Sequence, residues 1–116
     1  MPRTVSPNDA FNAIAELKRR EILVLLADRP RRIVGELIEE LGLPQSAVSK
    51  HLAILRKAGL VAVEKDGQHR RYSLRARELK AVHAWTQQFE KFWSDHLDAI
   101  QVEAERRARE IKNQKR

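Results

Sequence analysis

The chain has 116 residues, of which 42% are hydrophobic and 34% are charged, and its formal net charge at pH 7 is +7. This length suits one domain, and the composition is too apolar for a disordered chain and too polar for a membrane protein. The chain has no cysteine, and its start, "MPRTVSPNDAF", lacks the apolar core of a signal peptide, which argues against a secreted, disulfide-stabilised protein. We therefore expect a soluble, cytoplasmic protein that does not associate with a membrane.

Positive charge is concentrated in two segments. Residues 50–77 carry eight basic and two acidic side chains, interleaved with a regular apolar pattern. Residues 103–116 carry six basic and three acidic side chains without such a pattern. A basic surface indicates an acidic partner when its charges are presented on a shaped face. We interpret the first segment as a binding surface and the second as a charged helix end.

Three helices are predicted in the first 42 residues. The segment "SPND" predicts the start of a helix over about Pro7–Ala15, because serine can cap it, proline fits its first position and aspartate favours the helix dipole. A second helix follows in "LKRREILVLLA" and ends near Ala27, ahead of the proline in "DRPRR". A third, of about two turns, lies in "VGELIEEL", and Gly42 ends it as a left-handed cap.

A fourth helix is predicted to begin at Pro44. At about 100° per residue, Val48, Leu52 and Leu55 fall on one side and polar residues fall opposite them. Two short amphipathic helices joined by "GLP" predict a helix-turn-helix, whose second helix can lie in a DNA major groove. Lysine can donate to guanine and glutamine can pair with adenine. The predicted base contacts are Gln45, Ser46, Ser49 and Lys50, and the predicted phosphate contacts are His51 and Lys57.

The period then changes from helical to alternating in "VAVEKDGQHRRYSL". A two-residue type I′ turn at Asp66-Gly67 would place Val61 opposite Tyr72 and Val63 opposite Arg70. The inner face of this hairpin is then apolar at its base and basic toward its tip. The predicted DNA-backbone contacts in the hairpin are Lys65, Gln68, His69, Arg70 and Arg71. A helix-turn-helix followed by a basic hairpin predicts a mainly α, winged helix-turn-helix fold of about five helices.

One long final helix is predicted from about Arg77, because no proline or glycine follows. It carries a heavy aromatic stripe, with more apolar area than a small three-helix core needs. We therefore predict a homodimer in which this helix meets its twofold copy, with the first helix alongside. The predicted interface residues are Phe11, Trp85, Phe89, Phe92, Trp93, Leu97 and Ile100. The expected organisation is a flexible N-terminus (1–6), a DNA-binding and dimerisation domain (7–100) and a charged helix end (101–116).

Several of these segments resemble the ArsR/SmtB family of small winged-helix transcriptional regulators. The resemblance covers roughly Phe11 to Leu97 and rests on "LKRREILVLL", "VGELIEELGLPQSAVSKHLAILRKAGLV" and "KDGQHRRYSL". The end "WTQQFEKFWSDHLDAI" is similar to the SdpR-like subgroup. The resemblance implies a homodimer, most often a repressor, that binds an imperfect palindrome in double-stranded DNA near a promoter.

The resemblance also directs attention to the two metal sites that the family is best known for. The metalloid motif has cysteines at the positions of Ile38 and Glu40, so thiolate coordination is impossible here. The second site is an Asp-x-His…His-x-x-Glu pattern on the last helix. When it is anchored on His83, the other three positions hold Ala81, Ser94 and Leu97. We therefore expect no bound metal and no cofactor, and the sequence identifies no effector.

Two other functions stay open on the sequence alone. The first is a nickel- or zinc-type sensor with a non-standard site on the final helix, drawn from His83, Glu90, Asp95 and His96. The second is an RNA-binding or protein-interaction module that uses the winged helix as a scaffold. We do not expect an enzyme, because the chain has no glycine-rich phosphate loop, no cysteine nucleophile and no evident acid–base cluster.

Overall fold

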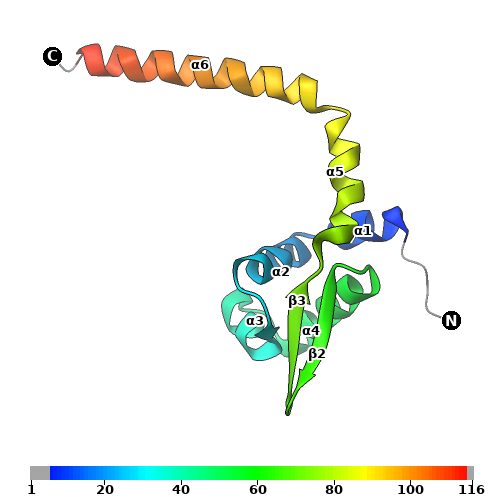
Figure 1. The fold of residues 1–116 in the computed structure, drawn as a ribbon. Coiled ribbons are helices and arrows are strands. Elements are labelled where there is room, and N and C mark those ends of the chain that lie inside the picture. The colour runs from blue at the N-terminus through cyan, green and yellow to red at the C-terminus, as the bar shows by residue number, and fades with distance from the viewer. Residues whose placement is uncertain (1–5, 115–116) are drawn as a thin grey trace. The chain divides into compact units, whose positions relative to one another are not determined.

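The computed structural model describes residues 6–114, with the side chains of Pro7, His96 and Leu97 excepted. The fold is mainly helical with a small antiparallel sheet, as the sequence predicted (Figure 1). In chain order the elements are α1 (Pro7–Ala13), α2 (Leu17–Asp28), β1 (Arg32–Ile33), α3 (Val34–Leu41), α4 (Gln45–Lys57), β2 (Val61–Asp66), β3 (His69–Leu74), the 3₁₀ helix η1 (Ala76–Leu79), α5 (Lys80–Gln87) and α6 (Glu90–Gln114). The chain divides into one compact unit that ends at His83 and another that begins at Ala84. No helix among residues 6–114 is long and apolar enough to span a membrane.

The predicted flexible N-terminus, residues 1–6, lies outside the described residues except for Ser6. The backbone N–H of Ser6 donates to Asp9 Oδ2 at 2.9 Å, which fixes the start of α1. At the other end, arginines of α2 satisfy the free carbonyls of α1, since Arg19 Nε donates to the carbonyl of Ala13 at 2.6 Å and Arg20 Nη1 to that of Ile14 at 2.7 Å. These bonds tie the two helices together where α1 ends.

Glycines with positive φ end both helices of the helix-turn-helix. Gly42 has φ +65° and its N–H donates to the carbonyl of Ile38 at 2.9 Å, as predicted for the end of α3. Gly59 has φ +78° after α4, and the next N–H, that of Leu60, donates to the carbonyl of Leu55 at 2.9 Å. This is a Schellman motif, and it leads the chain from α4 directly into β2.

The predicted docking side of α4 is the centre of the core. Val48, Leu52 and Leu55 are at most 1% exposed. Around them pack buried residues from α1, α2, α3 and β2, together with the end of α4. These residues are Ala13, Ile22, Leu23, Leu26, Leu37, Ala58, Leu60 and Val61. The opposite side of α4 is therefore held toward solvent.

The sheet differs from the prediction in strand number and in register. Strand β1 was not predicted, since two residues are too few to show alternation; it pairs with β3, and the strand order is β1-β3-β2. Val61 lies opposite Leu74 and Val63 opposite Tyr72, so the predicted register was wrong by two residues. The reason is the turn, which centres on Gly67 and Gln68 with a positive φ at the glycine alone. That pattern is typical of a type II′ turn rather than type I′.

The single long final helix was also predicted wrongly, because α5 and α6 are separated at Gln88 and Phe89 (Figure 1). In a continuous helix the N–H of Phe89 would donate to the carbonyl of Trp85. It donates instead to the carbonyl of Thr86 at 3.0 Å, and Gln88 Nε2 reaches the carbonyl of Trp85 at 3.3 Å. A side chain thus replaces a backbone donor, and the helix ends without proline or glycine.

Candidate nucleic-acid interface

One side of α4 is open to solvent and free of acidic residues. Its exposed residues fall within an arc of roughly 140° at about 100° per residue. They are Gln45, Ser46, Ser49, Lys50, Ala53, Arg56 and Lys57. All four predicted base contacts therefore lie on one accessible face, which is held rigidly because the opposite side of the helix is packed in the core.

His51 differs from the other predicted contacts on α4. Its side chain is 14% exposed, and its Nε2 lies 4.0 Å from Glu16 Oε1 at the start of α2. Its Nδ1 is buried without a hydrogen-bond partner. The imidazole thus lies near the N-terminus of α2. Among the residues of α4 that were predicted to contact DNA, His51 is the least exposed.

The two faces of the β2–β3 hairpin carry different chemistry. Directly opposed residues of an antiparallel pair share a face. One face holds the pairs Val61–Leu74, Val63–Tyr72 and Lys65–Arg70, and the other holds Ala62–Ser73, Glu64–Arg71 and Asp66–His69. The first face is apolar at its base and basic at its tip, as predicted, since a shift of two residues leaves every side chain on its face. The second face carries both signs of charge.

A groove of about 910 Å³ lies between α4 and the first face of the hairpin. Leu52, Ile54 and Tyr72 contribute its apolar surface. Its polar and small lining residues are Ser49, Ala53, Arg56, Lys57 and Arg70. No carboxylate is among the residues lining it, so the groove joins the exposed face of α4 to the basic tip of the hairpin.

On the second face, Arg71 is already engaged within the protein. Its Nε donates to Asp66 Oδ2 at 2.6 Å and its Nη1 to the carbonyl of Arg31 at 3.1 Å. The hydrogen bond from Arg71, and then its charge, hold the pKa of Asp66 below its ordinary value. The other predicted hairpin contacts, Lys65, Gln68, His69 and Arg70, are exposed.

The predicted interface residues of the last helices are largely exposed. Trp85, Phe89, Phe92, Trp93 and Ile100 are between 44% and 67% exposed. The rings of Trp85 and Phe89 meet edge to face with centroids 5.2 Å apart. Phe11 on α1 is half-buried, and the side chain of Leu97 lies outside the described residues.

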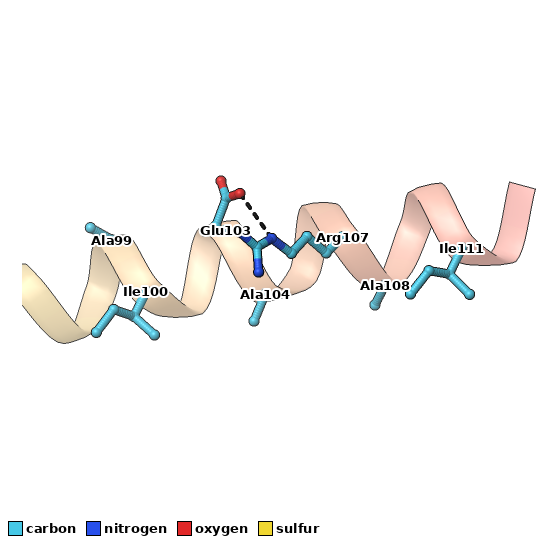
Figure 2. A pocket seen from close by; sticks show the side chains of 7 residues that line it. All are labelled: Ala99, Ile100, Glu103, Ala104, Arg107, Ala108 and Ile111. Atoms are coloured by element: carbon cyan, nitrogen blue, oxygen red, sulfur yellow. Dashed lines mark hydrogen bonds and ion pairs between the residues drawn. The ribbon is translucent and has the colours of Figure 1, made fainter.

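The apolar stripe of α6 continues beyond the predicted interface. Figure 2 shows Ile100, Ala104, Ala108 and Ile111 along one side of the helix, where they line a shallow groove of about 550 Å³. Glu103 and Arg107 lie beside them and are joined by an ion pair of 3.2 Å. The charge of this segment had predicted only a charged helix end, although the three- and four-residue spacing of its apolar side chains also indicates an apolar stripe.

Sequence reasoning also missed a buried cation beside α3. Arg32 is 2% exposed and binds Glu40, which stands where the metalloid motif has a cysteine. Within the described part of the chain, no three His, Cys, Asp or Glu side chains come together as a metal site would require. The guanidinium of Arg32 places a positive charge beside Glu40.

A helix-turn-helix whose second helix leads directly into a two-stranded hairpin defines a winged helix-turn-helix domain. Residues 17–63 match the family described as "Bacterial regulatory protein, arsR family". The match runs from the start of α2 to the middle of β2, and so includes the whole helix-turn-helix.

Individual relatives extend this match along the chain. The chain is 37% identical over 92 residues to the HTH-type transcriptional regulator Rv2034 of Mycobacterium tuberculosis, covering 79% of this chain and 82% of that protein. It is 46% identical over 72 residues to the transcriptional activator HlyU of Vibrio cholerae, covering 62% of this chain but only 66%, just under two thirds, of HlyU. A crystal structure of a possible transcriptional regulator for arsenical resistance is 35% identical, with a TM-score of 0.62 over 82% of this chain and 95% of that one. The chain belongs to the ArsR family of transcriptional regulators.

Proposed function

We propose that the protein is a homodimeric repressor that binds an imperfect palindrome in double-stranded DNA near a promoter. The observation that carries this proposal is the acid-free groove between α4 and the hairpin, bordered by Ser49, Arg56, Lys57 and Arg70. A phosphate backbone running beside this groove would meet cations from both elements. The polar face of α4 would then enter the adjacent major groove.

Affinity and sequence preference are assigned to different residues. Duplex DNA carries a dense row of phosphates, and cations that neutralise them release bound counterions. We assign this sequence-independent part of the DNA affinity to Lys65 and Arg70 at the hairpin tip and to Lys57. Gln45, Ser46, Ser49 and Lys50, near the N-terminus of α4, are assigned to base edges, because this end of a recognition helix enters the groove most deeply.

The proposed dimer rests on the exposed apolar face of α5 and α6. The face includes two tryptophans and two phenylalanines, each at least 44% exposed. Four large aromatic side chains exposed within nine residues of the chain are unusual on a monomer, and exposed apolar surface of this kind marks interaction sites. A twofold copy would cover it. In a dimer that binds a palindrome, the two α4 helices would lie in successive major grooves, about one helical turn apart.

Charge along α6 favours an antiparallel pairing of the two copies. Residues 90–105 carry five acidic side chains and one lysine, whereas residues 106–114 carry four basic side chains and one glutamate. In an antiparallel pair, the acidic part of each helix lies against the basic part of the other, whereas a parallel pair would place like charges together. The apolar stripe through Ile100, Ala104, Ala108 and Ile111 would form the seam.

The proposal is tested by fluorescence anisotropy with a duplex from the gene's own upstream region and a scrambled duplex of equal length, over a salt series. We expect tighter binding to the upstream duplex and affinity that falls steeply as salt rises. Equal affinity for both duplexes at every salt concentration would refute a sequence-specific regulator. A preference for single-stranded RNA over either duplex would favour the RNA-binding alternative.

Two additions to the same experiment test the remaining parts of the proposal. Transcription in vitro from the upstream region should fall when the protein is added. A rise in transcription would show that the protein is an activator and not the proposed repressor. Zn²⁺ or Ni²⁺ should change DNA affinity by less than about tenfold, a coupling of roughly 1.4 kcal/mol. A larger change would favour the metal-sensor alternative.

A further inference from the structure

The second face of the hairpin contains a set of contacts that joins β2, β3 and the turn before β1. Arg71 lies on β3, the central strand of the sheet, with Glu64 of β2 on one side and Ile33 of β1 on the other. Its guanidinium bonds Asp66 near the hairpin tip and the carbonyl of Arg31 before β1. A single side chain thus connects the tip of the hairpin to the body of the domain.

The carbonyl that Arg71 holds belongs to an unusual residue. Arg31 has φ +61° and is the only non-glycine residue with positive φ between residues 6 and 114. This conformation is unfavourable for a residue with a Cβ and persists where surrounding contacts maintain it. Here the side chain of Arg71 donates to the carbonyl of Arg31. The guanidinium of Arg31 lies 3.6 Å from Glu64 Oε2 on β2.

Arg70 and Arg71 are adjacent in sequence but lie on opposite faces of the hairpin. Arg70 is exposed and lines the groove beside α4. The Arg71 side chain is 31% exposed, and two of its nitrogens are already bonded within the protein. Moving the guanidinium of Arg71 toward a phosphate would break these two bonds, whereas Arg70 can move without such a loss.

We infer that Arg71 is a positioning residue, which holds the basic hairpin tip in place through Asp66 and Arg31, while Lys65 and Arg70 meet the phosphates. This inference rests on the proposed DNA-binding function and assigns a separate role to each neighbouring arginine. The hairpin is only two strands wide at its tip, because β1 pairs with β3 only at Tyr72 and Arg71. Such a narrow ribbon is weakly held on its own, so a link to the domain body would limit its motion.

The arginines are compared by matched substitutions, Arg70→Lys and Arg71→Lys. Lysine keeps the charge, but it is a point donor and lacks the planar fork that reaches two acceptors in different directions. We expect Arg70→Lys to bind the upstream duplex within about threefold of the wild type, and Arg71→Lys to lose at least about fivefold. Arg71→Lys with wild-type affinity would overturn the inference.

A substitution of Asp66 separates positioning from simple electrostatics. Removing this carboxylate makes the hairpin more positive, so electrostatic attraction alone predicts tighter binding to DNA for Asp66→Ala. The positioning role predicts weaker binding, by at least about threefold, with a salt slope that stays within experimental error of the wild type. Arg70→Ala, in contrast, should lower the slope by about 1. Tighter binding by Asp66→Ala would overturn the inference.

Hydrogen exchange provides a measurement that does not depend on DNA. In the free protein, the amides of residues 61–74 should exchange faster in Asp66→Ala and Arg71→Lys than in the wild type, while those of α2 and α4 stay unchanged. Unchanged exchange in both variants would overturn the positioning role even if DNA affinity fell. If wild-type protein did not distinguish the upstream from the scrambled duplex, the proposed function would fail. The exchange data would still test whether Arg71 holds the hairpin against the body of the domain.

Discussion

Arg32 and Glu40 form an ion pair through both terminal nitrogens of the guanidinium, and the arginine is 2% exposed. The pair connects β1 to the last turn of α3, and Arg32 Nη1 also reaches the carbonyl of Leu25 in α2 at 3.5 Å. Glu36 Oε2 lies 3.8 Å from Arg32 Nε, which has no hydrogen-bond partner. A charge in such a position is tolerated because its partner is fixed beside it.

Glu40→Ala should therefore destabilise the protein. Loss of a partner from a buried pair costs about 3–5 kcal/mol, and we expect roughly 1–3 kcal/mol here because Glu40 is 36% exposed and Glu36 remains. Arg32→Met should cost less than Glu40→Ala, since it removes the charge and keeps much of the volume. Urea unfolding followed by circular dichroism measures both, and a larger loss for Arg32→Met would contradict this account.

Gly35 within α3 and Gly42 at its C-terminal cap should respond to alanine in opposite directions. Gly42 has φ +65°, where a Cβ is unfavourable, so Gly42→Ala should cost about 1 kcal/mol. Gly35 lies inside the helix without a positive φ and with nothing within 4 Å of an added Cβ, so Gly35→Ala should stabilise by about 0.4–1 kcal/mol. Thermal unfolding of the two variants measures this difference. The same sign for both would show that the helix end is not set by Gly42.

Lys50→Ala and Arg70→Ala should affect DNA binding in different ways. Loss of a base contact from Lys50 should reduce the preference for the upstream over the scrambled duplex by about 1–3 kcal/mol. Loss of a phosphate contact from Arg70 should weaken both duplexes alike and lower the salt slope by about 1. Lys18→Ala on α2 is the matched loss of one charge and should change neither quantity much. Indistinguishable profiles for Lys50→Ala and Arg70→Ala would refute the assigned roles.

Phe92→Ser should weaken the proposed dimer. Phe92 is 67% exposed in the single chain, and its burial against a second copy would contribute on the order of 2 kcal/mol per subunit. Val24 on α2 is also 67% exposed, so Val24→Ser is a matched control that should leave association unchanged. Sedimentation velocity over a concentration series measures both. A monomeric wild type at every concentration would refute the dimer itself.

Local sequence signals determined most of the helix-turn-helix. The left-handed cap at Gly42 and the buried side of α4 depend on residues that are near neighbours in the chain. The alternation in β2 and β3 also predicted which side chains share a face, because that pattern has a period of two and survives a register error of two. The ArsR-family resemblance rested on these same local segments.

The tertiary structure decided features whose partners are distant in the sequence or compete with a local preference. Strand β1 exists because it pairs with β3, and the hairpin register depends on which turn Gly67 adopts. The break before α6 arises where a glutamine side chain takes a carbonyl that the helix would otherwise use. Arg71 also donates a hydrogen bond to the carbonyl of Arg31, forty residues earlier, and the pattern of charges along the sequence does not predict this bond. Periodicity reports which side of an element is apolar, but only the folded chain determines which polar groups have already found a partner.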